Sequence, residues 1–78
     1  MTAPKGRQPN RQLTELRINA GMAPSDLAYR AGVSAKTVRL VEAGFTPGPR
    51  TQFAIARVFD LLPLELFPFE RQRRAVRS

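Results

Sequence analysis

Two cations lie in a short segment, Gly32 to Gly44, that reads GVSAKTVRLVEAG. Lys36 and Arg39 are three residues apart, so a helix places them on one face, with Leu40 beside them. Lysine and arginine donate hydrogen bonds to guanine and to phosphate, and an apolar side chain can contact a thymine methyl group. These residue types favour contact with a nucleic acid. The alternative is a solvated basic face on an ordinary packed helix.

The residue types that are missing exclude most other chemistry. The chain has no cysteine and no histidine, which removes thiol nucleophiles, thiolate metal sites and the usual general base. Its carboxylates are not clustered, so an enzyme is the least expected class, and we expect no metal, cofactor or small-molecule ligand. The net charge is +7, and 11 of the 13 cations are arginine. This balance indicates a polyanionic partner, either nucleic acid or an anionic membrane surface.

The chain has 78 residues, which is enough for one small domain. No apolar run approaches the roughly 18 residues that span a bilayer. The opening MTAPKGRQPNRQ lacks the apolar segment of a signal peptide. We therefore expect a cytoplasmic protein that does not enter a membrane.

Helix start and stop signals predict an all-α fold with five helices. Asn10 and Ser34 are good N-cap residues, Pro24 suits a first helical position, and Gly21 and Gly44 are stop signals. The expected helices cover about 10–20, 24–31, 35–43, 50 or 51 to 60, and a short segment within 61–67 that Pro68 ends. The predicted domain organisation is a disordered basic arm over 1–9, a helical domain over 10–68 and a basic tail over 69–78.

The apolar positions repeat at helical spacing and give a predicted core. Its expected members are Leu13, Leu16, Ala20, Leu27, Ala28, Ala31, Val33, Val38, Val41, Phe53, Ile55, Ala56, Val58 and Phe59. The fourth helix is apolar enough to form the centre of this core.

The second and third predicted helices have the spacing of a helix-turn-helix. Ala28 is small enough for a steep crossing of two helices, and Gly32 tolerates the positive φ that a tight turn needs. Val38 and Val41 would then pack the third helix onto the second. Taken alone, many helical hairpins match this pattern.

The flanking sequence makes the match more specific. The segments LTELRINAGMAPSDLA and GVSAKTVRLVEAG, followed by Pro49 and IARVF, resemble the Cro/cI phage-repressor family, also called the XRE family. The resemblance covers roughly Gln12 to Phe67. It implies a compact lambda-repressor-like bundle of five helices that binds double-stranded DNA.

The resemblance also implies roles for individual residues. The residues implied to contact bases lie on the third helix: Ala35, Lys36, Arg39 and Leu40. Those implied to contact the DNA backbone or minor groove are Ser25, Ser34, Thr37, Thr46 and Arg50. The chain departs from the family at Ala23 and Pro24, where relatives usually carry serine or threonine and a phosphate-binding glutamine. Ser25 is the expected substitute.

Two structural features follow from the same resemblance. Arg17 and Glu42 match positions that commonly form a partly buried salt bridge. Family members often dimerise through the fifth helix, where the apolar residues are Leu64, Leu66, Phe67 and Phe69. A homodimer of this kind would require a palindromic operator with half-sites about one turn apart.

The favoured function is a sequence-specific transcriptional regulator, either Cro-like or a compact phage or prophage repressor, working on DNA in the cytoplasm. One alternative is an antitoxin of a toxin–antitoxin pair that uses the same module. Another is a protein-interaction module with Leu40, Phe45 and Phe69 as contacts. The terminal cations either follow phosphates or keep the chain soluble; they are Lys5, Arg7, Arg71, Arg73, Arg74 and Arg77.

Overall fold

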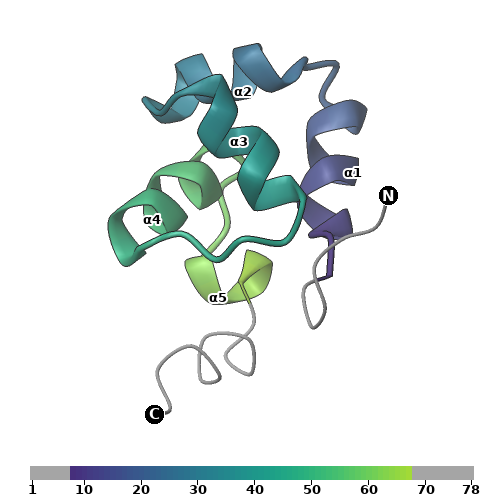
Figure 1. The fold of residues 1–78 in the computed structure, drawn as a ribbon. Helices are drawn as coiled ribbons and strands as arrows, with labels where there is room; N and C mark the ends of the chain where they lie inside the picture. The colour runs from purple at the N-terminus through teal and green to yellow at the C-terminus, as the bar shows by residue number, and fades with distance from the viewer. Residues whose placement is uncertain (1–7, 68–78) are drawn as a thin grey trace, which may run out of the picture.

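The computed structural model describes residues 8–67, which form five α-helices and no strand. The helices are α1 (Arg11–Asn19), α2 (Pro24–Ala31), α3 (Ala35–Glu42), α4 (Pro49–Val58) and α5 (Pro63–Leu66). Figure 1 shows α3 in front, with α1 and α4 on either side of it and α5 below. The predicted all-α class with five helices is confirmed. Within 8–67, no helix has the length and apolar character needed to cross a membrane.

Most of the predicted arm and the whole predicted tail lie outside the described residues. The arm was expected over 1–9 and the structure describes only residues 8 and 9 of it. Phe69 and the cations of both segments are therefore not placed.

Two helices, α1 and α3, begin at side-chain caps. The Oδ1 atom of Asn10 accepts a hydrogen bond of 3.1 Å from the Leu13 N–H, and Ser34 Oγ accepts one of 3.0 Å from the Thr37 N–H. Ala23 has no side chain that could cap α2. Instead, its own N–H donates to Asp26 Oδ2 over 2.8 Å. Capping of this kind satisfies N–H groups that the helix itself leaves unpaired and fixes where the helix starts.

Helix α4 differs from its predicted range at both ends. It begins at Pro49, one or two residues earlier than expected, because proline is pre-set for the first helical position and its missing N–H costs nothing there. It ends at Val58 instead of Asp60. Asp60 has a φ of 62°, in the left-handed region, which stops the helix.

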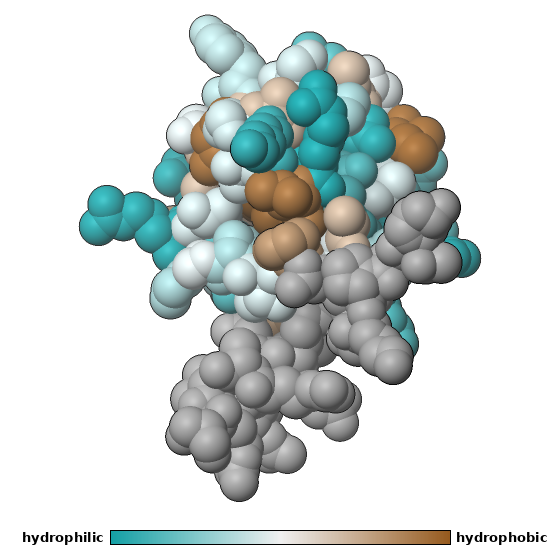
Figure 2. Space-filling view, viewed as in Figure 1, coloured by the Kyte–Doolittle hydropathy of each residue, from teal (hydrophilic) through white to brown (hydrophobic). Residues whose placement is uncertain are grey.

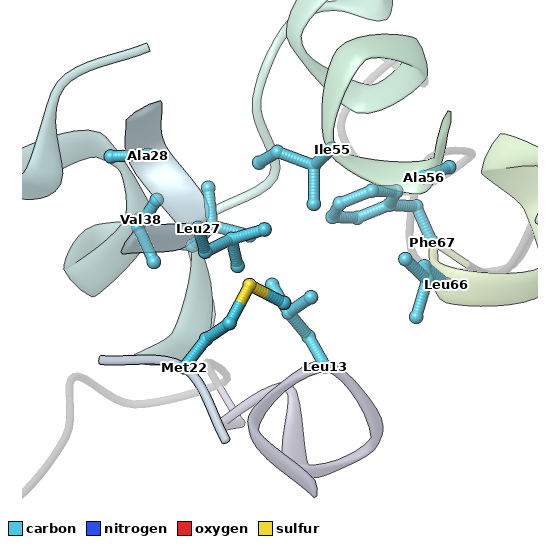
Figure 3. Packing of buried hydrophobic residues seen from close by; sticks show 10 residues of the cluster. Leu13, Met22, Leu27, Ala28, Val38, Ile55, Ala56, Leu66 and Phe67 are labelled. Carbon is cyan, nitrogen blue, oxygen red and sulfur yellow. The ribbon is translucent and has the colours of Figure 1, made fainter. Parts of the chain in front are cut away.

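The core lies where all five helices meet (Figure 3). Its buried members are Leu13, Met22, Leu27, Ala28, Val38, Val41, Ile55, Ala56, Leu66 and Phe67. Leu66 and Phe67 are at most 1% exposed, so they are not available for the predicted dimer surface. Leu66 of the short α5 and Phe67 directly after it close the base of the core, and among the described members of the predicted set Leu64 is exposed.

Two residues predicted for the core are on the surface. Ala20 is exposed, and Phe53 is 53% exposed. The inward positions of α4 are Gln52, Ile55 and Ala56. Because each residue turns the helix by about 100°, Phe53 points away from the side that Gln52 faces.

The α2–turn–α3 unit has the geometry of a helix-turn-helix. Ala28 is only 4% exposed, and its small side chain lets the two helices approach closely. Gly32 has a φ of 78°, and its N–H and that of Val33 both donate to the Ala28 carbonyl, over 2.8 and 3.0 Å. Val38 and Val41 are buried against the core and hold α3 in place.

Candidate nucleic-acid interface

The outer face of α3 carries two cations and one apolar side chain. Lys36 and Arg39 are exposed, and Leu40 is 39% exposed. Val38 and Val41 face the core, so the outward direction of the helix is fixed. Figure 2, seen from the side on which α3 lies in front, shows strongly hydrophilic side chains beside a hydrophobic patch.

Ala35 does not share this face as predicted. It is half-buried and packs against the hydrophobic core. The reason is the helical rotation of about 100° per residue, which places Ala35 to the side of the direction in which Lys36 points. The outer face therefore consists of Lys36, Arg39 and Leu40.

The first turn of α3 presents backbone donors. Ser34 Oγ accepts the Thr37 N–H, and the two hydroxyl oxygens are 3.0 Å apart, so these side chains support each other. Ser34 is exposed and Thr37 is half-buried. Within the described chain, the N–H groups of Ala35 and Lys36 have no hydrogen-bond partner. Such donors at a helix N-terminus suit an anion.

The far end of α3 is attached to α1 through Glu42. The Arg17 Nε and Nη2 atoms donate to the two carboxylate oxygens of Glu42 over 2.6 and 3.2 Å. Both side chains are 13% exposed, and Arg17 Nη1 also donates to the Met22 carbonyl over 2.8 Å. The structure thus brings together the predicted pair.

Asn10 adds a second attachment that sequence reasoning missed. Its backbone N–H donates to the Glu42 carbonyl over 2.8 Å, and its side-chain amide donates to the Leu66 carbonyl over 2.9 Å. Asn10 is 5% exposed. It therefore joins the start of α1 to the ends of α3 and α5. Its capping role was visible in the sequence, but its two distant partners carried no local signal.

The segment between α3 and α4 is held by a buried amide. Gln52 is 5% exposed, and its Nε2 atom donates to the Pro47 carbonyl over 2.8 Å. This bond fixes the segment that contains half-buried Thr46 and leads to exposed Arg50. Sequence reasoning missed Gln52, although a polar residue three positions before inward-facing Ile55 was an available signal.

The start of α2 is less suited to an anion than the start of α3. Ser25, the predicted substitute for the phosphate-binding glutamine, is exposed. However, the Asp26 carboxylate already accepts the Ala23 N–H and brings negative charge to this end of α2. A phosphate at Ser25 would be repelled by that charge.

The charges of the interface are not neutralised internally. Among residues 8–67, Arg17 with Glu42 is the one ion pair. Lys36, Arg39 and Arg50 consequently have no carboxylate partner in this part of the molecule. They leave a positive surface on α3 and at the start of α4.

Comparison with known proteins identifies the family. No protein-family model and no solved structure matches the chain. A relative from Archaeoglobus fulgidus is 35% identical over 60 residues, which are 76% of this chain and 86% of the relative. That relative is an uncharacterized HTH-type transcriptional regulator. The chain belongs to the HTH-type transcriptional regulators. In this regulator, α2, the turn around Gly32 and α3 form the helix-turn-helix.

Proposed function

We propose that the protein is a sequence-specific regulator of transcription that reads the major groove of double-stranded DNA with α3. The observation that carries this proposal is the outer face of α3. Lys36, Arg39 and Leu40 project from a helix that is capped at Ser34 and attached to α1 at Glu42. A rigid helix with outward donors suits the width of the major groove.

The base contacts are assigned by side-chain chemistry. Lys36 and Arg39 donate to guanine O6 and N7, and arginine can do so through two parallel bonds. Leu40 contacts a thymine methyl group. Ala35, which is half-buried, offers at most the edge of its methyl group.

The phosphate contacts flank the reading helix. The free N–H groups of the first turn of α3, together with Ser34 and Thr37, bind one phosphate. Thr46 and Arg50 bind the backbone or enter a narrow minor groove beside it. Ser25 contributes least because of the adjacent Asp26 carboxylate.

The finer class is a Cro-like regulator or a compact phage or prophage repressor of the Cro/cI (XRE) family. The resemblance of the sequence over roughly 12–67 supports it. Such a protein binds without catalysing a reaction and acts on DNA in the cytoplasm. Among the described members of the predicted dimer surface, self-association through α5 would depend on Leu64, since Leu66 and Phe67 fill the core.

Selection of bound duplexes from a random pool tests the proposal. We expect enrichment of one short motif, and its symmetry and half-site spacing report whether two copies bind together. The Lys36→Ala/Arg39→Ala double variant should lose discrimination between this motif and a random duplex by more than tenfold, since each good base contact is worth about 1–3 kcal/mol.

Arg11→Ala/Arg30→Ala is the matched control, because it removes the same net charge from exposed positions on α1 and α2. Equal discrimination by the wild type and the Lys36→Ala/Arg39→Ala variant would falsify the proposal.

A further inference from the structure

Helix α4 exposes an aromatic ring beside unpaired cations. Phe53 is 53% exposed, and the guanidinium carbon of Arg57 lies 5.9 Å from the centroid of its ring. Arg50, three residues before Phe53, lies on the same outward side of α4 and is exposed. We call these three residues the α4 outer face.

The composition of this face is that of a binding surface. Arginine and aromatic residues are enriched among the side chains that contribute most to protein–protein affinity. The guanidinium group of Arg57 lies within cation–π range of the Phe53 ring. Neither Arg50 nor Arg57 has a carboxylate partner within residues 8–67. Both the apolar ring and the positive charge are therefore available to a partner.

We propose that the α4 outer face docks an acidic segment of another protein that also carries an aromatic or large aliphatic side chain. The carboxylates of that segment pair with Arg57 and Arg50, and its apolar side chain covers Phe53. Arg50 is shared with the proposed DNA surface, whereas Phe53 and Arg57 belong only to this one. The inference goes beyond the proposed function and does not require it.

Charge and apolar character together favour an acidic protein segment over two other occupants, a DNA duplex and a second copy of this chain. Phosphates of a duplex would pair with the arginines but leave the Phe53 ring uncovered. A second copy of this chain would have to supply a group of carboxylates. Its described carboxylates without a cation partner are dispersed over α1, α2, α5 and the segment before α5, at Glu15, Asp26, Glu65 and Asp60.

Selection of random peptides displayed on phage against the full chain provides the test. Enriched peptides should combine several aspartates or glutamates with one aromatic or large aliphatic residue. Synthetic copies of these peptides, followed by fluorescence anisotropy, should bind Phe53→Ser and Arg57→Ser at least tenfold more weakly than the wild type. Arg57→Glu should bind more weakly still.

Two control variants match these changes elsewhere on the surface. Tyr29→Ser removes an aromatic ring that is 88% exposed on α2, and Arg30→Glu reverses a charge in the last turn of α2, as Arg57→Glu does in α4. Both should bind the peptides like the wild type. Thermal melting of each variant shows that the chain is still folded.

Three results would overturn the inference. The first is that the selected peptides bind Phe53→Ser and Arg57→Ser as tightly as the wild type. The second is that Arg57→Ser weakens duplex binding as strongly as Arg50→Ser, which would assign the face to DNA. The third is concentration-dependent dimerisation, measured by sedimentation, that Phe53→Ser abolishes. If Phe53→Ser still binds the duplex like the wild type, a failure of the docking inference does not affect the proposed function.

Discussion

Leu40 places an apolar surface next to the two cations of α3. It is 39% exposed, and it stands one residue after Arg39 on a face that is otherwise polar. A single exposed leucine is common on protein surfaces, and in water its exposed part contributes no favourable contact. In a duplex, the same side chain can remove a thymine methyl group from water.

Replacing thymine by uracil in the selected motif tests this contact, because uracil lacks only the methyl group. We expect one position at which the change weakens binding about fourfold, from the roughly 0.8 kcal/mol gained when one such group is buried. The Leu40→Ala variant should bind the thymine and uracil duplexes equally. A loss with uracil that persists in Leu40→Ala would assign the methyl contact to another residue.

At the scale of whole helices, α3 is positioned by its two ends. Ser34 caps the first turn, and Glu42 is bound by Arg17 through its side chain and by Asn10 through its backbone. The orientation of the reading face therefore depends on α1, which itself presents no residue to the duplex in our proposal.

The Glu42→Ala variant should destabilise the fold by about 3 kcal/mol, because it leaves Arg17 largely buried without its carboxylate. For a domain of this size we expect the melting temperature to fall by roughly 10–20 °C. Glu15→Ala, which removes an exposed carboxylate from α1, is the control and should change the melting temperature little. An unchanged melting temperature in Glu42→Ala would show that the ion pair contributes nothing.

Asn10 offers a finer dissection, since aspartate keeps the capping oxygen but loses the amide donor. Asn10→Asp should lower the free energy of unfolding by about 1–3 kcal/mol, because the buried Leu66 carbonyl loses its hydrogen bond. Asn10→Ala should lower it by about 1 kcal/mol more through loss of the cap. Urea denaturation of both variants measures the difference. Wild-type stability in Asn10→Asp would mean that the bond to Leu66 is dispensable.

The elements that sequence predicted well are those set by local chemistry. Caps at Asn10 and Ser34, the proline that starts α2 and the turn at Gly32 all depend on neighbours within a few residues. The exposed side of α3 also followed from Val38 and Val41, apart from Ala35 at its edge.

The failures arose where packing between distant segments decided the outcome. Phe53 was expected inside because it is large and apolar, yet Gln52 takes the inward position and binds the Pro47 carbonyl. Leu66 and Phe67 were expected on a dimer surface because the resemblance implies dimerisation through the fifth helix. They are buried because the other four helices leave the base of the core open to them. The burial of Leu66 and Phe67 has no signature in the local sequence, whereas the helical spacing between Gln52 and Ile55 was a weak signal for the inward position of Gln52.

The whole molecule carries a net charge of +7, which draws it to any polyanion. Phosphate contacts release counterions, so affinity for DNA should fall steeply as salt rises. In the proposed function, this long-range attraction supplies binding to any sequence, and the outer face of α3 supplies the choice among sequences.

The dependence of binding on salt separates phosphate contacts from base contacts. The plot of log affinity against log salt should lose about 0.9 from the magnitude of its slope in Arg50→Ala, the value for one phosphate. Arg30→Ala removes an equally exposed cation from α2 and should leave the slope unchanged. Identical slopes for Arg50→Ala and the wild type would exclude Arg50 from the backbone contacts.

The hydrogen bond of 2.9 Å between Asn10 and the Leu66 carbonyl brings together the two ends of the folded unit. The polypeptide thus enters and leaves this unit at a single place. A domain with that layout can be transplanted into one exposed loop of an unrelated host protein without stretching either scaffold, because the loop needs to open by only a few ångströms. The same layout favours a circular permutant, in which a short linker joins these two ends and new ends lie elsewhere on the surface. Such a permutant would move the point at which a reporter is attached.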